Sequence, residues 1–277
     1  MMKSFKLSNI LSYFILIAMS AFVIFPFLWT FLTSIKTEIQ MFSVPPVWIP
    51  DPVTTQHYSD IIDEGQFQAF MKNSLTVSGV STLISMLVSI PAAYGFAKYR
   101  YKFSGLLFAT VVAIRMFPPI VMGVPFFLMM RQLGLIDTNL ALIITYLPLQ
   151  LTLIIWILEG FFRQIPNEIE EAAEIDGLGT FGKFLKIAVP LSMPAIGVAS
   201  IFSFLAAWNE FMFALTLTRT DASQTMPIGI AGYVTTFQTF WGKMSATGIL
   251  YIIPVIIFTI FAQKGMIKGL TAGATKE

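Results

Sequence analysis

The sequence predicts an all-α integral membrane protein with six transmembrane helices and a helix-turn-helix loop between the fourth and the fifth. Of its 277 residues, 56% are hydrophobic and 12% are charged, whereas a soluble domain carries about 25% charged residues. The apolar residues form runs of about 20, the length that crosses a bilayer as a helix. These runs lack the strict alternation of membrane-barrel strands, so helices are the expected spanning structure.

Six segments meet this length requirement, and we expect them to form one transmembrane domain over residues 1–277. The expected spans are residues 10–32, 75–97, 106–130, 140–158, 193–217 and 244–262, followed by a C-terminal cytoplasmic tail at 263–277. The first span follows Lys3 and Lys6, as a signal peptide would. It stays apolar as far as Leu32, which is too long for a cleaved segment.

Lysine and arginine residues are unevenly divided between the two sides of the expected spans. Eleven lie on the side of the N-terminus and five on the other side. The eleven are Lys3, Lys6, Lys98, Arg100, Lys102, Arg163, Lys183, Lys186, Lys264, Lys268 and Lys276, and the five are Lys36, Lys72, Arg131, Arg219 and Lys243. Because cytoplasmic loops are enriched in positive charge, we expect both termini and the loop 159–190 in the cytoplasm.

Several classes of function are disfavoured by composition. The chain has no cysteine, which excludes disulfides and thiolate chemistry. Its net charge of +2 is dispersed, and no basic block suggests a nucleic-acid partner. The single histidine, His57, falls in a polar loop and is expected to be solvated rather than functional. A metal site is therefore not expected.

The third expected span combines a charge with several prolines. Arg115 is followed by Pro118, Pro119 and Pro125. Proline removes a backbone donor and bends a helix, and an arginine at the bilayer centre costs about 2.5–3.5 kcal/mol. The prolines have two interpretations: simple kinking of the helix, or a broken helix that forms a wall of an internal cavity. The charge of Arg115 beside the prolines favours the cavity wall.

The loop 159–190 exceeds the roughly 15 residues beyond which connections usually have structure or function of their own. Asn167 is a suitable N-cap, and Gly177 can end a helix. Ile169, Ala172, Ala173 and Asp176 share one helical face. Glu168, Glu170, Glu171, Glu174 and Asp176 would be repelled by anionic lipid. We therefore expect one helix here, a second over about 180–189, and a protein partner rather than a membrane surface.

The same loop resembles a known family. The segment Glu171-Ala172-Ala173 and then Asp176-Gly177, Phe184, Pro190 and Pro194 match the "EAA" loop of ABC-importer permeases. Two further segments, 207–211 (Ala-Trp-Asn-Glu-Phe) and 267–274 (Ile-Lys-Gly-Leu-Thr-Ala-Gly-Ala), resemble the maltose-type sugar permeases. The similarity covers nearly the whole chain and is closest to the smaller, six-span subunit of the pair.

The resemblance implies a permease that imports a sugar or oligosaccharide without chemistry of its own. Its implied partners are a second homologous permease, a cytoplasmic ATPase dimer that binds ATP and Mg²⁺, and an extracytoplasmic solute-binding protein. The implied ATPase-coupling residues are Glu171, Ala172, Ala173, Asp176 and Gly177. A C-terminal contact with the ATPase is implied for Gly269, Leu270, Thr271, Ala272 and Gly273.

ATP is not expected to bind this chain itself. Residues 177–183 have the glycine and lysine spacing of a phosphate-binding loop, but Phe184 stands where the magnesium-binding hydroxyl would be. We interpret this match as chance. No cofactor of this chain is therefore expected.

A small set of polar residues within the spans has two interpretations. Arg115, Trp208, Asn209 and Glu210 either line the substrate path or hold the bundle together, for example through a bridge between Arg115 and Glu210. A secondary transporter driven by an ion gradient is the alternative function, but no clear repeat is visible and Glu210 is the one acid within the spans. A membrane-embedded enzyme is disfavoured, because it would need paired catalytic groups.

Overall fold

The computed structural model describes the backbone of residues 7–99 and 101–274 and the side chains of residues 11–99 and 101–261. Within these ranges the chain is helical, and its β-structure is one antiparallel bridge between Val234 and Thr239. The helices are α1 (Leu7–Ser34), α2 (Glu38–Met41), α3 (Gln56–Asp63), α4 (Gln66–Lys98), α5 (Ser104–Ala113), the 3-10 turn η1 (Ile114–Met116), α6 (Pro119–Gln132), α7 (Asn139–Arg163), α8 (Asn167–Ile175), α9 (Thr180–Lys183), the π-helical η2 (Phe184–Ala188), α10 (Val189–Leu191), α11 (Met193–Trp208), α12 (Met212–Leu217), α13 (Met226–Gly232) and α14 (Trp241–Ala274). The predicted all-α class is confirmed.

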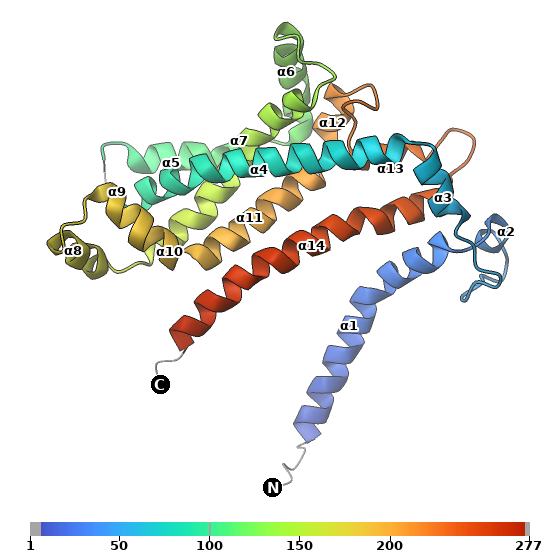
Figure 1. Ribbon diagram of the computed structural model, residues 1–277, viewed down its shortest axis with the longest axis horizontal. Helices are drawn as coiled ribbons and strands as arrows, with labels where there is room; N and C mark the ends of the chain where they lie inside the picture. Colours follow the sequence, from blue (N-terminus) through green and yellow to red (C-terminus); the bar gives the residue numbers. More distant parts are fainter. Residues whose placement is uncertain (1–6, 100, 275–277) are drawn as a thin grey trace. The chain divides into compact units, whose positions relative to one another are not determined.

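The structure has four to six candidate spanning helices, a range that includes the predicted six. Four helices, α1, α4, α7 and α14, are long and apolar enough to cross a membrane. Two further candidates are bent pairs: α5–η1 meets α6 at 97°, and the segment Thr180–Leu191 meets α11 at 75°. The first bend is plain in Figure 1, where α6 stands across the direction of α5. Counting each bent pair as one span gives six.

Two of the predicted spans, the third and the fifth, were predicted as continuous segments but are interrupted in the structure. The third breaks at Phe117 and Pro118, where the sequence had indicated a broken helix. The fifth, predicted over 193–217, was wrong as a single helix, because α11 ends at Trp208 and α12 starts at Met212. The reason lies in the intervening residues, whose side chains satisfy the backbone groups that the break exposes.

The chain divides into two compact units. The first contains residues up to Phe67 together with Ile230–Ile252. In this unit the predicted solvated state of His57 was wrong: the side chain is buried, and its Nε2 lies 2.8 Å from the carbonyl oxygen of Lys36. Gly242 packs so closely on the His57 ring that a Cβ there would overlap it. His57 therefore joins the segment after α1 to the start of α14.

The second unit contains Gln68–Gly229 and the chain from Ile253 onward. In this unit α7 packs along α11 (Figure 1). Two clusters of buried apolar side chains form its core, one around Leu142 and Phe213 and the other around Tyr94 and Phe162. Gln150 joins α4, α7 and α11 through Ser85 Oγ at 3.0 Å and the carbonyl oxygen of Ser203 at 3.1 Å.

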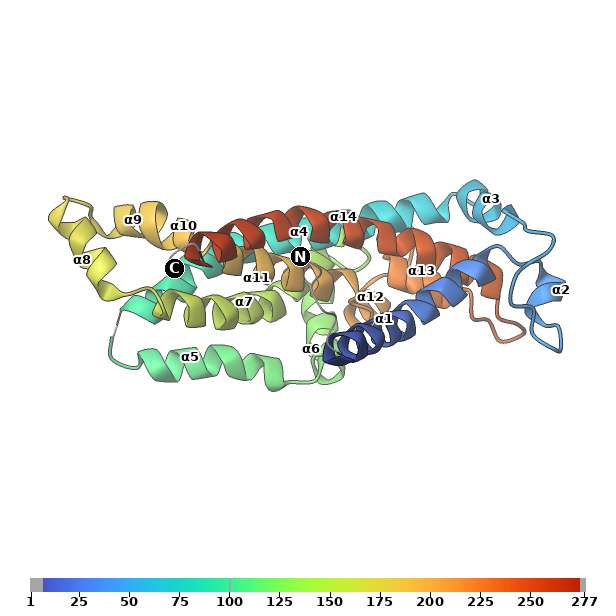
Figure 2. The same cartoon turned by 90° about the horizontal axis from the view of Figure 1, so that it is seen from below.

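The loop that follows α7 projects beyond the ends of α4 and α7 in both views (Figures 1 and 2). Helix α7 runs to Arg163, so it includes residues that the sequence assigned to the loop. Its extension is stabilised by an ion pair between Glu159 and Arg163, one turn apart. What remains of the loop is α8, a turn, and the short helical segment Thr180–Leu191.

Candidate functional site

Residues that favour helix initiation and helix termination mark the two ends of α8. Pro166 occupies the N-cap position, one residue before the predicted cap, and its backbone is extended at φ −58° and ψ 137°. Proline is tolerated here because the backbone nitrogen at the start of a helix has no hydrogen-bond acceptor within the helix, so the missing N–H costs nothing. Glu168 and Glu170 follow in the first turn, where the positive end of the helix dipole stabilises carboxylates. The predicted helix is thus confirmed, with its cap shifted by one residue.

The end of α8 is a tight turn that depends on glycine. Gly177 has a φ of +86°, a left-handed conformation that side chains disfavour. The Gly177 amide donates to the carbonyl of Glu174 at 3.0 Å, and the Leu178 amide donates to the carbonyl of Ala173 at 2.9 Å. These two bonds satisfy the last carbonyls of the helix in a Schellman motif. The turn then directs the chain into α9.

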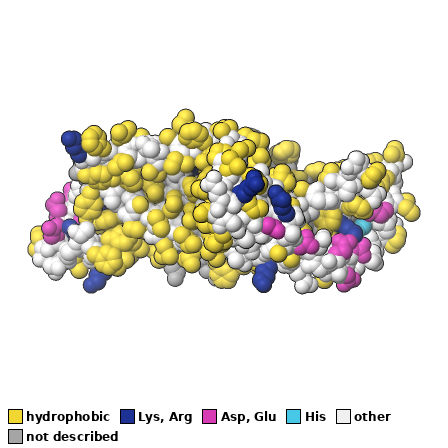
Figure 3. All heavy atoms as spheres, turned by 90° about the horizontal axis from the view of Figure 1, so that it is seen from above, with side chains coloured by type: hydrophobic (Ala, Val, Ile, Leu, Met, Phe, Trp, Pro, Cys, Tyr) yellow, Lys and Arg dark blue, Asp and Glu magenta, His cyan; other side chains and the backbone are white. Residues whose placement is uncertain are grey.

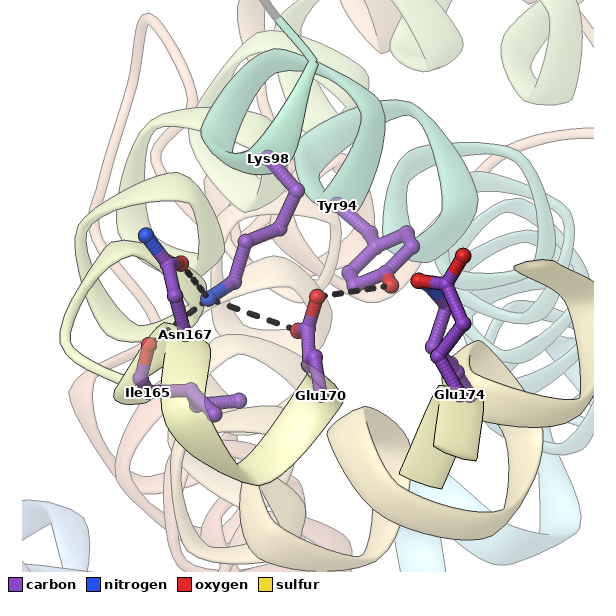
Figure 4. Close-up of polar contacts among 7 residues, drawn as sticks. Tyr94, Lys98, Ile165, Asn167, Glu170 and Glu174 are labelled. Atoms are coloured by element: carbon purple, nitrogen blue, oxygen red, sulfur yellow. Dashed lines mark hydrogen bonds and ion pairs between the residues drawn. The ribbon is translucent and has the colours of Figure 1, made fainter. Parts of the chain in front are cut away.

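The first half of α8 is attached to α4 by polar contacts (Figure 4). The Lys98 ammonium lies 2.6 Å from the Ile165 carbonyl oxygen, 3.2 Å from Asn167 Oδ1 and 3.3 Å from Glu170 Oε1. The Tyr94 hydroxyl donates to the other carboxylate oxygen of Glu170 at 3.4 Å. These contacts hold α8 at its start, and most of the residues that follow are exposed.

The uncovered side of α8 is both acidic and apolar. Ile175 is 88% exposed, and Glu171, Ala172 and Asp176 are exposed beside it. We call these four residues the α8 face. In Figure 3 acidic side chains gather at the end of the molecule where α8 lies, next to a largely hydrophobic surface.

Of the five residues predicted to couple to an ATPase, four are exposed. Glu171, Ala172 and Asp176 belong to the α8 face, and Gly177 is exposed at its end. Ala173 is different, because it is buried at 5% exposure and packs α8 onto its own protein. The predicted shared face of Ile169, Ala172, Ala173 and Asp176 is thus divided between exposed and buried positions.

The segment after α8 is a helix of mixed pitch. It begins as α9, widens into the π-helical η2 at Phe184–Ala188, and ends as α10 before the bend at Ser192. Phe184 packs on Tyr94 with ring centroids 5.1 Å apart. Lys183 forms an exposed ion pair with Glu174 at 2.8 Å, and this ammonium holds the pKa of Glu174 below its ordinary value. The second helix predicted in the loop is confirmed.

Glu210 lies in the break between α11 and α12 and satisfies the start of α12. Its carboxylate accepts the amide of Phe213 at 2.8 Å and the amide of Ala214 at 3.1 Å. The Tyr146 hydroxyl of α7 donates to the same carboxylate at 2.7 Å. Glu210 therefore acts as a helix cap and as a link between two helices.

The other predicted path residues lie in different surroundings. Arg115 is exposed in η1, at the bend between α5 and α6, and no ion pair joins it to Glu210 among the described side chains. Trp208 is buried and stacks on Phe204, with ring centroids 5.4 Å apart. Asn209 is exposed, and its side-chain amide donates to the Leu205 carbonyl at 2.9 Å.

The end of α12 is held by Asp137, a residue that the sequence did not single out. Its amide donates to the carbonyl of Leu217 at 2.8 Å. Its carboxylate accepts the amides of Arg219 at 2.8 Å and Thr220 at 3.0 Å, the Thr220 hydroxyl at 2.8 Å, and the Ser223 hydroxyl. Burial alone would raise the pKa of Asp137, but these hydrogen bonds hold it well below its usual range.

Two apolar cavities lie within the second unit. The first cavity has a volume of about 410 Å³ and lies between α6 and α12. It is lined by Ile120, Gly123, Val124, Phe127, Met212 and Thr216. The other, of about 480 Å³, is open between α4, α11 and the second half of α14. Neither is lined by a charged side chain. The predicted C-terminal contact at Gly269–Gly273 falls within α14, but the side chains there lie outside the described residues.

Sequence reasoning did not identify three residues that make important contacts in this site. Lys98 had counted only toward the charge of the cytoplasmic loops, Tyr146 was one aromatic among many, and Asp137 stood in a short polar turn. A basic residue at the last position of α4 is the one local signal that could have pointed to a helix-end contact. Its partner could not be identified, because Glu170 was one of five acids in the loop.

Residues 85–265 match the family model described as "Binding-protein-dependent transport system inner membrane component". The chain belongs to this family. It is a multi-pass permease component of a binding-protein-dependent, ABC-type transport system, and the alternative of an ion-gradient-driven transporter is not supported. The family is one of transport permeases rather than of enzymes, in agreement with the sequence-based expectation.

Curated relatives share about a third of the sequence. The chain is 36% identical over 253 residues to the "Sulfoquinovosyl glycerol transport system permease protein SmoH" of Agrobacterium fabrum, covering 91% of this chain and 89% of the relative. It is 35% identical to the "Trehalose transport system permease protein SugB" of Mycobacterium tuberculosis, covering 92% and 93%. It is 33% identical to the "Trehalose/maltose transport system permease protein MalG" of Thermococcus litoralis, covering 94% of each.

A solved structure shares the fold. A chain from a bacterial ABC transporter involved in the import of the acidic polysaccharide alginate superposes with a TM-score of 0.77 over 95% of this chain and 99% of the other, at 20% identity. The fold of an ABC-importer permease is therefore shown for nearly the whole chain.

Proposed function

We propose that this chain is one half of a two-permease channel that imports a sugar or oligosaccharide, driven by a separate cytoplasmic ATPase dimer. The sugar class is supported by the names of the relatives, which include sulfoquinovosyl glycerol, trehalose and trehalose/maltose systems. A binding protein outside the membrane would deliver the sugar, as the family description implies. ATP and Mg²⁺ would bind the ATPase, with no cofactor on this chain.

The observation that carries the proposal is the α8 face. It is exposed, held at one end, and formed by Glu171, Ala172, Ile175 and Asp176. Its acidic side chains are unsuited to an anionic membrane surface, and its exposed isoleucine is suited to a hydrophobic pocket of a protein partner. A small residue at position 172 allows that partner to approach closely. The exposed turn at Gly177 and the C-terminal residues Gly269–Gly273 are proposed to add contacts.

The test is to block the α8 face in the assembled transporter. Ala172→Arg adds a long charged side chain at an exposed position without disturbing the interior. We expect it to remove the ATPase from the purified complex and to abolish uptake. Ala222→Arg, the same change at an exposed alanine of another loop, is the matched control and should do neither. Uptake that is normal without any ATPase partner, or that stops only when the ion gradient collapses, would overturn the proposal.

The proposed orientation places the α8 face in the cytoplasm. It rests on the eleven positive residues of that side against five on the other. Since the chain has no cysteine, single substitutions Asp176→Cys and Ala222→Cys report location directly. A membrane-impermeant maleimide should label position 222 in intact cells and position 176 only after the membrane is opened. The reverse pattern would contradict the orientation.

The proposed sugar path runs past the two helix breaks. Arg115 and Asn209 are exposed at these breaks, which supports a place on the channel wall. Trp208 and Glu210 lie behind that wall, since Trp208 is buried and Glu210 caps α12. Asn209→Ala should raise the KM of uptake while leaving the ATPase bound. An unchanged KM for both Asn209→Ala and Arg115→Gln would contradict this path.

A further inference from the structure

Lys98 makes a convergent set of contacts at the entry to α8. It is the last residue of α4, and its ammonium contacts the Ile165 carbonyl, Asn167 Oδ1 and Glu170 Oε1 at 2.6, 3.2 and 3.3 Å. A lysine ammonium has three protons to donate. Two hydrogen bonds and one ion pair of Lys98 reach the six-residue segment 165–170, which leads into α8 and forms its first turn (Figure 4). The side chain is thus committed to positioning this segment.

The ion pair between Lys98 and Glu170, which we call the Lys98–Glu170 joint, is sheltered from solvent on both sides. The side chains of Lys98 and Glu170 are 7% and 12% exposed, whereas in the other ion pair of α8 Lys183 is 14% exposed and Glu174 is 67% exposed. Removing one partner of a sheltered pair leaves the other charge without solvent or a counter-charge to stabilise it. Breaking the Lys98–Glu170 pair should therefore cost more than breaking a pair with one well-solvated partner.

A second side chain of α4 strengthens the same joint. Tyr94 lies one helical turn before Lys98, and residues four apart share one face of a helix. Its hydroxyl contacts Glu170 Oε2 at 3.4 Å, while its ring packs against Phe162 and Phe184. Among the described polar contacts of α8, those of Tyr94 and Lys98 reach a membrane-spanning helix, and that of Lys183 stays within the loop.

We propose that Lys98 is a positioning residue that transmits motion between α8 and α4. The inference rests on the proposed role of α8 as the ATPase-contacting helix. A displacement of α8 by the ATPase moves a spanning helix only if a stiff contact joins the two. The Lys98–Glu170 joint is such a contact, and it connects the α8 face to the helix that carries Ser85 and its bond to Gln150 in the core. Lys98 itself touches neither sugar nor nucleotide in this role.

The experiment uses the complete transporter, reconstituted in lipid vesicles with its ATPase and binding protein. ATP hydrolysis is measured without and with the sugar-loaded binding protein, and the ratio of the two rates reports coupling. Lys98→Met keeps the length of the side chain and removes its charge. We expect assembly and basal hydrolysis to persist while the ratio falls about fivefold or more, the lower range of typical allosteric coupling.

Two matched variants separate transmission from a structural role. Lys98→Arg keeps a positive charge and several N–H donors at this position and should keep the ratio within about twofold of the wild type. Lys183→Met removes the exposed pair of the same loop and should leave the ratio unchanged. An unaltered ratio in Lys98→Met, or an equal loss in all three variants, would overturn the inference.

A further variant keeps the test decisive if Lys98→Met fails to assemble. Glu170→Gln preserves the shape and an acceptor for Lys98 but removes the charge attraction. An intermediate loss of the ratio in an assembled Glu170→Gln complex supports the inference, and a normal ratio assigns Lys98 a purely structural role. If the wild-type complex contains no ATPase at all, the proposed function fails. If the ATPase binds through α8 and only the ratio is insensitive, the inference about Lys98 alone fails.

Discussion

Helices α12 and α8 are both short, and both lie at interruptions between spanning segments, but they are held in different ways. Helix α12 is fixed at its start by Glu210 and at its end by Asp137, and three of its six side chains are fully buried. Helix α8 is fixed near its start by Lys98, buries Ala173, and ends in an exposed turn. The difference indicates that α12 is anchored at both ends, whereas the polar contacts of α8 with a spanning helix are confined to its first half.

The largest effect is expected from removing the cap of α12. Glu210→Ala leaves the amides of Phe213 and Ala214 and the Tyr146 hydroxyl without their acceptor. Three lost bonds to a carboxylate in a poorly hydrated region should lower the free energy of unfolding by about 3 kcal/mol or more. Thermal unfolding of the purified protein in detergent measures the loss.

The control for this change is Tyr146→Phe, which removes one donor and leaves the cap intact. We expect it to cost about 1 kcal/mol. If Glu210→Ala unfolds at the wild-type temperature but weakens sugar uptake, Glu210 acts on the substrate and the comparison of the two helices fails.

The next effect is expected at the other end of α12 and depends on pH. Asp137→Asn keeps one acceptor oxygen and loses the charge, which should cost about 1 kcal/mol at pH 7 for this partly exposed group. Because the pKa of Asp137 is lower in the folded than in the unfolded state, the wild type has its full advantage above the ordinary aspartate pKa of about 4. That advantage should shrink as the pH falls below about 4.

Melting temperatures of both proteins at pH 7 and pH 3 test this expectation. A difference between them that is constant with pH would show that the hydrogen bonds of Asp137 do not require its charge.

A smaller and local effect is expected at the turn that ends α8. Gly177→Ala places a side chain at a φ of +86°, which costs about 1 kcal/mol. Gly179→Ala is the matched control, because Gly179 has an ordinary φ of −69° and open space around its Cα. We expect retention of the ATPase, measured by co-purification, to be reduced in the Gly177→Ala variant and unchanged in the Gly179→Ala variant. Equal retention would show that the α8 face tolerates reorientation.

The smallest effect is expected from the exposed pair between α8 and α9. Glu174→Gln removes the partner of Lys183, and an exposed ion pair contributes little to stability. The melting temperature should not change measurably, and neither should its dependence on salt. A clear destabilisation would mean that α8 is held at two points rather than one.

Sequence reasoning succeeded where the signal was local. The spans follow from the length of apolar runs, and α8 follows from Asn167, the acids of its first turn and Gly177, all within a few residues of one another. These signals act through the backbone of the same helix, so no tertiary information is needed.

Sequence reasoning failed where the partner was distant in the chain. One of the two interpretations of Glu210 paired it with Arg115, the one opposite charge inside the predicted spans, but its partners are backbone amides and Tyr146, 64 residues away. The expectation assumed a continuous helix, in which those amides would already be bonded. The break after Trp208 released them, and the nearest carboxylate satisfied them. Lys98 and Glu170 are likewise joined only by the packing of α4 against the loop.

The π-helical segment η2 between α9 and α10 has a consequence for how this loop could have evolved. A π-helix contains one residue more per turn than the α-helix it interrupts. Lys183 and Glu174 both precede this segment, so a change of one residue within Phe184–Ala188 would leave their ion pair in place. Deleting the extra residue would restore α-helical pitch between the pair and the bend at Ser192. The loop can therefore gain or lose one residue here while α8 and α9 keep their contact with each other.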